Sequence, residues 1–285
     1  MSAFRTEPLA TVDRDIAPVF LLAERNRGRD LVLITEWLDW LASGSTAAST
    51  IRARRYALRA FAREYDLTTA TPDNVTEYLG RPCRGPNGRK SVLATLRSFY
   101  RWALARGFVE QDPTRLARTI RVPVGVPKPV PEVVLARAIG RADPQTRLML
   151  LLGAYAGLRR AEIASLHSDD VSDTGLIITG KGGRMRRIPI HPRLATELGF
   201  TGWVFPSPVR HGYHVGPSYV ADRVEAVLEG WTCHSLRHRF ATCAYRATRD
   251  IRAVQELLGH SSPTTTAKYV LIDEDAKEAA VLAVA

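Results

Sequence analysis

Apolar residues recur at helical spacing from residue 30 to about residue 116, interrupted by short polar segments. Gly44-Ser45 ends the first predicted helix, and Pro72 suits the first position of a later one. Residues 89–106 predict a further helix with one apolar side. Before these helices, the charged and glycine-containing segment 25–29 predicts a break after a loose tail that has room for one short helix.

The second half of the chain has a different pattern. Residues 148–154 are almost entirely apolar and predict a buried helix, which Gly157 ends with a bend. Two β-type runs around a glycine-rich turn predict a hairpin over 175–190, and the chain is helical again after Cys233. Four prolines within residues 122–131 favour an extended linker between the halves. The fold class is therefore mainly α with a small β-sheet.

Composition narrows the class of protein. The chain has 285 residues, enough for one large domain or two ordinary ones, and 45% of them are hydrophobic, so a sizeable core can be buried. Three scattered cysteines suit neither a disulfide framework nor a zinc site and fit a reducing cytoplasm. The N-terminus lacks the apolar run of a signal peptide, and no stretch approaches the length of a membrane span. We expect a cytoplasmic protein without a metal or another cofactor.

The net charge of +11 favours a nucleic-acid partner. Between residues 45 and 121, fifteen lysines and arginines face six acidic residues. Phosphates are the natural counter-charge, although a solvated basic face or the arginine-rich bias of a GC-rich genome would give the same count. The predicted DNA contacts are Arg52, Arg55, Arg59, Arg89, Lys90, Arg97 and Arg101 in the first half, and Arg186, Arg187 and Arg239 in the second.

Two arginines stand out as ligands for a phosphodiester, because a guanidinium fork can bind two oxygens in one plane. Arg237 lies three residues after His234, so a helix presents both on one face, and a histidine can accept a proton near neutral pH. Arg159 follows Gly157-Leu158, but its neighbour Arg160 carries the same charge, and periodicity alone does not choose between the two. The alternative for Arg159 is a surface ion pair with Glu162 or Asp169.

Three further residues complete a set suited to phosphoryl transfer without a metal. Lys181 in a hairpin turn could protonate a leaving oxygen, and Tyr269 could attack phosphorus. His260 follows Gly259, a predicted helix cap. Taken singly, these residues would be an exposed turn lysine, a core tyrosine and a helix-end histidine.

Together these motifs resemble the tyrosine recombinases, or phage integrase family. The resemblance covers nearly the whole chain, and all six catalytic positions hold accepted residue types. In the helical half, Asp112 stands before Pro113 where the family usually has asparagine. The matching segments are Gly157-Leu158-Arg159, Gly180-Lys181-Gly182, His234-Ser235-Leu236-Arg237-His238, Leu257-Leu258-Gly259-His260 and Thr264 to Tyr269 in the second half, and Leu96 to Ala103 in the first.

The resemblance implies a mechanism. Tyr269 forms a 3′-phosphotyrosyl bond and releases a 5′-hydroxyl, with Lys181 as general acid and His234 assisting proton transfer. Neither ATP nor a metal is needed, because the covalent intermediate conserves the bond energy. The expected partners are double-stranded DNA at core-type att sites, a homotetramer on that DNA, and an accessory directionality factor. The residues expected to stabilise the transition state are Arg159, Arg237 and His260.

The resemblance also implies a two-domain, C-shaped clamp around DNA. The expected segments are an N-terminal tail (1–28), a helical core-type DNA-binding domain (29–118), a proline-rich linker (119–131), a catalytic domain (132–272) and a C-terminal tail (273–285). In relatives such a tail packs on the neighbouring protomer, here through Val281, Leu282 and Val284. Its small apolar end also resembles a bacterial protease degron, which is a second hypothesis for the tail.

Within the family, the first interpretation is an integrase of a phage or mobile element, and the alternative is an Xer-like resolvase of chromosome dimers. A type IB topoisomerase shares the catalytic logic, but the helical half and the tail argue against it. A DNA-binding repressor that has kept the fold would have no need of Tyr269. The sequence does not indicate the DNA site.

Overall fold

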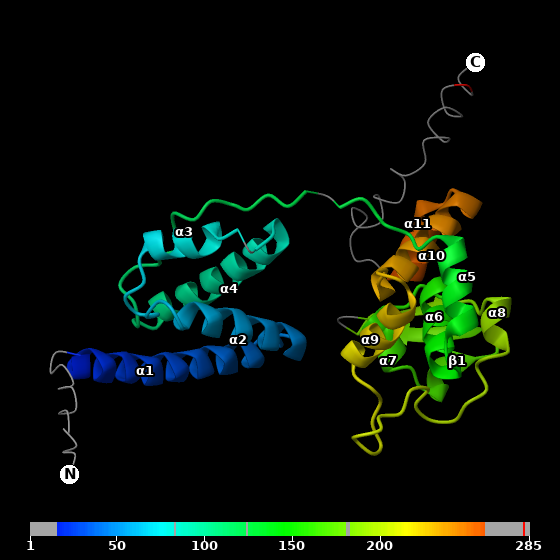
Figure 1. Ribbon diagram of the computed structural model, residues 1–285, viewed down its shortest axis with the longest axis horizontal. Helices are drawn as coiled ribbons and strands as arrows, with labels where there is room; N and C mark the ends of the chain where they lie inside the picture. The colour runs from blue at the N-terminus through cyan, green and yellow to red at the C-terminus, as the bar shows by residue number, and fades with distance from the viewer. Residues whose placement is uncertain (1–15, 83, 124, 181–182, 260–281, 283–285) are drawn as a thin grey trace, which may run out of the picture. The chain divides into compact units, whose positions relative to one another are not determined.

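The computed structural model describes residues 16–82, 84–123, 125–180, 183–259 and 282 (Figure 1). The chain divides into two compact units, Met1–Pro123 and Val124–Ala285. The structure is mainly helical with one small sheet, as the sequence predicts. No helix in the described part of the chain combines the length and the apolar character needed to cross a membrane.

The N-terminal unit is helical and has an aromatic core. Trp37 meets Phe99 edge-to-face at 5.6 Å between ring centroids, and Phe61 meets Tyr78 in the same way at 5.0 Å. Such contacts add to the free energy of burying the rings. The helices are α1 (Ile16–Ser43), α2 (Ala48–Ala62), α3 (Pro72–Gly80) and α4 (Pro86–Ala105).

Two helix starts differ from the prediction. The break expected at 25–29 is wrong, because α1 runs through it. One glycine inside a helix costs only about 1 kcal/mol, which the burial of Leu33, Ile34 and Trp37 farther along the helix outweighs. Helix α4 begins three residues before the predicted 89, with Pro86 at its first position.

The C-terminal unit is built around α6 (Pro144–Tyr155), whose residues 148–154 are all buried, as predicted. It contacts α5, α7, α8, α9 and α10. The other helices are α5 (Glu132–Arg141), α7 (Arg160–Ala164), the 3-10 helix η1 (Ser168–Asp170), α8 (Pro192–Ala195), α9 (Pro217–Val227), α10 (Cys233–Thr248) and α11 (Ile251–Leu258).

The predicted hairpin is part of a three-stranded antiparallel sheet. Leu176 faces Ile188 and Thr179 faces Met185 in the register of β2 and β3. Leu176 and Ile188 are buried against the core, so β2 and β3 are anchored to the C-terminal unit. The strands are β1 (Val171–Ser172), β2 (Gly175–Thr179) and β3 (Met185–Ile188).

Glycines let α10 approach the core closely. A Cβ at Gly153 would lie 2.9 Å from Cδ1 of Leu236, and one at Gly157 would lie 2.4 Å from the ring of Phe240. Gly157 also has φ of +63°, which favours glycine. The close contact fixes α10, the helix that carries Arg237, against the end of α6.

The buried Asp30 gives a prediction for the N-terminal unit. Burial, reinforced by the nearby carboxylate of Asp66, raises the pKa of Asp30 to about 6. Between about pH 4 and pH 6 the folded state therefore binds more protons than the unfolded chain, so its stability falls as the pH rises. We expect Asp30→Asn to abolish this dependence and to raise the free energy of unfolding at pH 7 by about 1 to 3 kcal/mol.

Urea unfolding of the N-terminal transition at pH 4, 5, 6 and 7 measures both effects. Asp39→Asn, at an exposed position of the same helix, is the matched control and should change neither quantity. If Asp30→Asn destabilises the protein at pH 7, the carboxylate has a structural role that outweighs its burial.

Candidate active site

Arg159 lies at the start of α7, where the chain turns out of α6 through Gly157. Its backbone N–H donates to Oε2 of Glu162 at 2.8 Å, and its guanidinium donates to Oε1 at 2.8 Å. This arrangement satisfies a backbone donor at the helix start and holds the arginine by both ends. The side chain remains 39% exposed, so a ligand can reach it.

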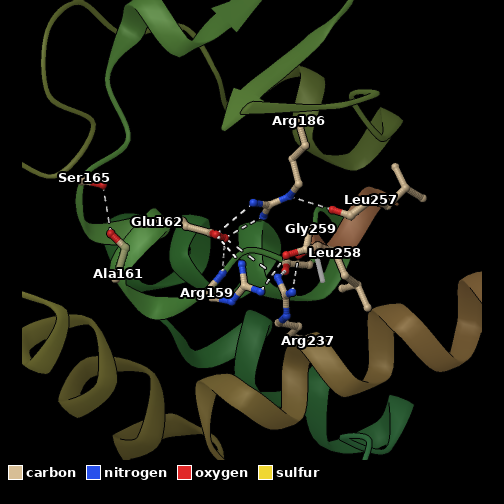
Figure 2. A network of polar contacts seen from close by, with 10 residues as sticks. Arg159, Ala161, Glu162, Ser165, Arg186, Arg237, Leu257, Leu258 and Gly259 are labelled. Atoms are coloured by element: carbon tan, nitrogen blue, oxygen red, sulfur yellow. Dashed lines mark hydrogen bonds and ion pairs between the residues drawn. The ribbon is translucent and has the colours of Figure 1, made fainter. Parts of the chain in front are cut away.

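Glu162 is the centre of the site (Figure 2). Its side chain is 8% exposed, and Arg186 donates to both of its oxygens, at 2.9 and 2.7 Å. A third guanidinium, that of Arg237, lies 3.9 Å away. Burial alone would raise the pKa of Glu162, but the hydrogen bonds from Arg186 and Arg159 outweigh it and hold the pKa below its ordinary value. The carboxylate is therefore a fixed negative charge among three arginines.

Arg237 is almost fully buried, with 1% of its side chain exposed. It projects from α10 and donates to the carbonyl of Gly157 at 2.5 Å. His234, one turn earlier on α10, is exposed, and its ring centroid lies 4.2 Å from that of His238. His234 and Arg237 thus lie on one helix, as predicted, but the arginine is buried and the histidine is exposed.

The three arginines also bind the end of α11. Gly259 ends this helix with φ of +62°, and the last carbonyls of a helix have no partner within it. These carbonyls carry the negative end of the helix dipole, which favours cations. The pairs are Arg186 Nε with the carbonyl of Leu257 at 2.8 Å, Arg237 Nη2 with that of Leu258 at 2.5 Å, and Arg159 Nη2 with that of Gly259 at 3.3 Å.

The structure therefore brings Arg159 and Arg237 together at the end of α11, and His234 lies on the same helix as Arg237. Lys181, His260 and Tyr269 lie outside the described residues, so their roles stay predictions. No group of three or more His, Cys, Asp or Glu side chains among the described residues is arranged to hold a metal ion.

The arginines predicted to contact DNA fall into two kinds. On α2, Arg52, Arg55 and Arg59 are exposed, and so are Lys90 and Arg101 on α4. The others are partly buried or donate to protein groups. Arg89 is half-buried, Arg97 donates to the carbonyl of Ala117, Arg187 to that of Thr174, Arg186 to Glu162, and Arg239 to Glu132 and the carbonyl of Ala154.

Arg186 and Arg239 thus have surroundings different from those expected. Their side chains are 8% and 13% exposed, so a phosphate would have to displace a carboxylate to reach either guanidinium. Glu162 is the residue that sequence reasoning missed as part of the site. The expected ion pair of Arg159 with Glu162 exists, but Glu162 is buried and shares its carboxylate with Arg186. The signal was the spacing of Arg159 and Glu162, which is that of a capping box.

Residues 135–275 match the model of the phage integrase family. The chain is 31% identical over 228 residues to tyrosine recombinase XerC of Neisseria gonorrhoeae, a match that covers 67% of this chain and 71% of the relative. It is 29% identical over 275 residues to tyrosine recombinase XerD of Rhizobium meliloti, covering 82% and 88%.

Solved structures share the fold. A lambda integrase (75-356) dimer bound to a COC′ core site has a TM-score of 0.66 at 19% identity, covering 82% of this chain and 96% of that one. A lambda integrase tetramer bound to a Holliday junction has a TM-score of 0.67 at 19% identity, covering 84% and 76%. The arrangement of helices around a small sheet is therefore the same as in these lambda integrase structures.

We expect Glu162→Gln to destabilise the C-terminal unit by about 3 to 5 kcal/mol, because it leaves the buried guanidinium of Arg186 without its carboxylate. The pKa of Glu162 is lowered in the folded state, so its contribution is complete above the unfolded pKa of about 4.5 and is lost as the pH falls through the folded pKa. Wild type should lose this part of its stability under acid, whereas the variant has already lost it.

Thermal and urea unfolding at pH 7 and at pH 3 to 5 test this expectation. The control is Glu229→Gln, which removes the exposed carboxylate paired with Arg137 and should cost about 0 to 1 kcal/mol. Equal losses in the two variants would show that the central carboxylate contributes no more than a surface pair.

Proposed function

The chain belongs to the phage integrase family of tyrosine recombinases, enzymes that cleave and rejoin DNA, and on that premise we propose that Arg159, Arg237 and Tyr269 carry its chemistry. The observation that supports this most is the convergence of Arg159 and Arg237 at the end of α11. Two guanidinium groups can together stabilise the negative charge on the phosphodiester oxygens in the transition state. Tyr269 follows α11 by eleven residues in the sequence.

In the proposed reaction, the oxygen of Tyr269 attacks phosphorus, and its proton goes to His234. The bond from phosphorus to the 5′ oxygen breaks, and Lys181 gives that oxygen a proton. Arg159, Arg237 and His260 stabilise the charge on the non-bridging oxygens. The 5′-hydroxyl of a partner strand then reverses these steps. The exposure of His234 and the 39% exposure of Arg159 support access for DNA to both. Arg237 is 1% exposed and would have to exchange a bond to the carbonyl of Gly157 or Leu258 for one to a phosphate oxygen.

We further propose that the remaining basic side chains position the duplex. Exposed Arg52, Arg55 and Arg59 on α2, with Lys90 and Arg101 on α4, suit contacts to the phosphate backbone, which set register without reading sequence. A clamp formed by the two units, a homotetramer on DNA, packing of the tail on a neighbour and an accessory factor stay predictions. The lambda integrase tetramer on a Holliday junction supports the tetramer by analogy of fold.

For the biological role, the relatives favour an Xer-like recombinase over the phage or mobile-element integrase that we expected first. Curated relatives at about 30% identity are named XerC and XerD, and the XerD match extends over 82% of this chain. We therefore propose resolution of chromosome dimers as the leading role and integration of an element as the second candidate.

Tyr269→Phe tests the chemistry. Wild type incubated with fragments of the host chromosome in EDTA should give a protein–DNA adduct that survives SDS. The variant should give none while binding the same DNA with unchanged affinity, because only the attacking oxygen is lost. An adduct that persists in Tyr269→Phe would assign the nucleophile to another residue, and loss of the wild-type adduct in EDTA would indicate a metal.

Sequencing the DNA trapped in wild-type adducts from cells distinguishes the two roles. An Xer-like recombinase should be trapped at a chromosomal site remote from its own gene, and deletion of the gene should leave chromosomes as dimers. Trapping at the two ends of a segment that contains the gene would instead support an element integrase.

A further inference from the structure

All three guanidinium nitrogens of Arg186 donate to groups within the protein (Figure 2). Nη1 donates to Oε1 of Glu162 at 2.9 Å, Nη2 to Oε2 at 2.7 Å, and Nε to the carbonyl of Leu257 at 2.8 Å. Its side chain is 8% exposed. Each guanidinium nitrogen therefore has a protein partner, and the residue joins strand β3 to α7 and to the end of α11.

A second contact ties Arg186 to the residue that ends α11. A Cβ built on Gly259 would lie 2.9 Å from Cδ of Arg186, so the arginine packs directly on this turn. Gly259 immediately precedes His260 in the sequence. Arg186 thus holds the backbone at the point where the chain leaves α11 toward His260 and Tyr269.

Glu162 transmits the same constraint to Arg159. Oε1 accepts from the guanidinium groups of Arg186 and Arg159, and Oε2 accepts from the guanidinium of Arg186 and the backbone N–H of Arg159. Each carboxylate oxygen is therefore held between the two arginines. Without Arg186, only Arg159 itself would still donate hydrogen bonds to both oxygens, so the carboxylate that orients Arg159 would be held less firmly.

We propose that Arg186 is a positioning residue, which acts through Glu162 on Arg159 and through the end of α11 on the residues that follow it, and makes no phosphate contact of its own. This inference rests on the proposed function. It replaces the expectation that Arg186 touches the DNA backbone. Strand β3 then contributes to the site through Arg186 itself, in addition to leading out of the predicted turn with Lys181.

Arg186→Lys is the sharpest test. Lysine keeps the positive charge and can still reach one carboxylate oxygen, but an ammonium cannot form the planar fork that spans Glu162 and Leu257. On the chromosomal fragment that wild type cleaves, we expect the rate of adduct formation at saturating DNA to fall about 100-fold, as small misplacements of reacting groups do. The affinity for DNA, and its dependence on salt, should stay at wild-type values.

Arg137→Met is the control, because Arg137 also pairs with a glutamate of the C-terminal unit, on an exposed part of its surface. It should form the adduct at the wild-type rate. Arg186→Met, which also removes the charge, should be slower than Arg186→Lys. Rates are compared at a temperature at which circular dichroism shows that each variant is folded. If the methionine variant does not fold, the comparison rests on the lysine variant.

Two results would overturn this inference and leave the proposed function unaffected. One is a wild-type rate in Arg186→Lys. The other concerns Arg186→Met. If this variant forms the adduct at the normal rate at saturating DNA but binds DNA more weakly, and if the slope of its log binding constant against log salt concentration is smaller by about one, it has lost a phosphate contact. If wild type itself forms no adduct on any chromosomal fragment, the proposed function fails, and this inference fails with it.

Discussion

One buried carboxylate organises the site. Glu162 sits among Arg159, Arg186 and Arg237, so one negative charge is shared by three positive ones. The surplus positive charge is offset in part by the carbonyls at the end of α11, which carry the partial negative charge of the helix. The guanidinium groups are thereby held in place by the protein alone. In the proposed reaction, such prior orientation is what makes electrostatic stabilisation of a transition state effective.

The rest of the C-terminal unit serves to keep these groups in place. Residues 148–154 of helix α6 are apolar and buried on every side, and α6 forms the base against which α10 packs. Gly153 and Gly157 leave room for Leu236 and Phe240, which fixes the height and rotation of α10. The direction of the Arg237 side chain follows from that packing, because Arg237 lies between Leu236 and Phe240 on α10. A larger residue at either glycine would move the arginine even though neither glycine carries any chemistry.

The local features of this arrangement could be predicted from the sequence, whereas its long-range contacts could not. The buried helix 148–154, the hairpin, and the spacing of His234 and Arg237 depend on residues close together in the chain, where periodicity is informative. The environment of Arg186 could not be predicted, since its partners are 24 and 71 residues away. The break expected at 25–29 failed for a related reason, because long-range packing of α1 outweighs a local preference.

The same distinction bears on how charge should be interpreted. A net charge of +11 treats every arginine alike, yet the structure separates them by burial. Arg52, Arg55 and Arg59 are exposed on one helix and are available to counter phosphates. Arg186 and Arg239, in contrast, neutralise carboxylates inside the C-terminal unit. Since an arginine already paired with a carboxylate releases fewer counterions from DNA, we propose that the charge acting on DNA is smaller than the sequence count and lies chiefly with the exposed residues.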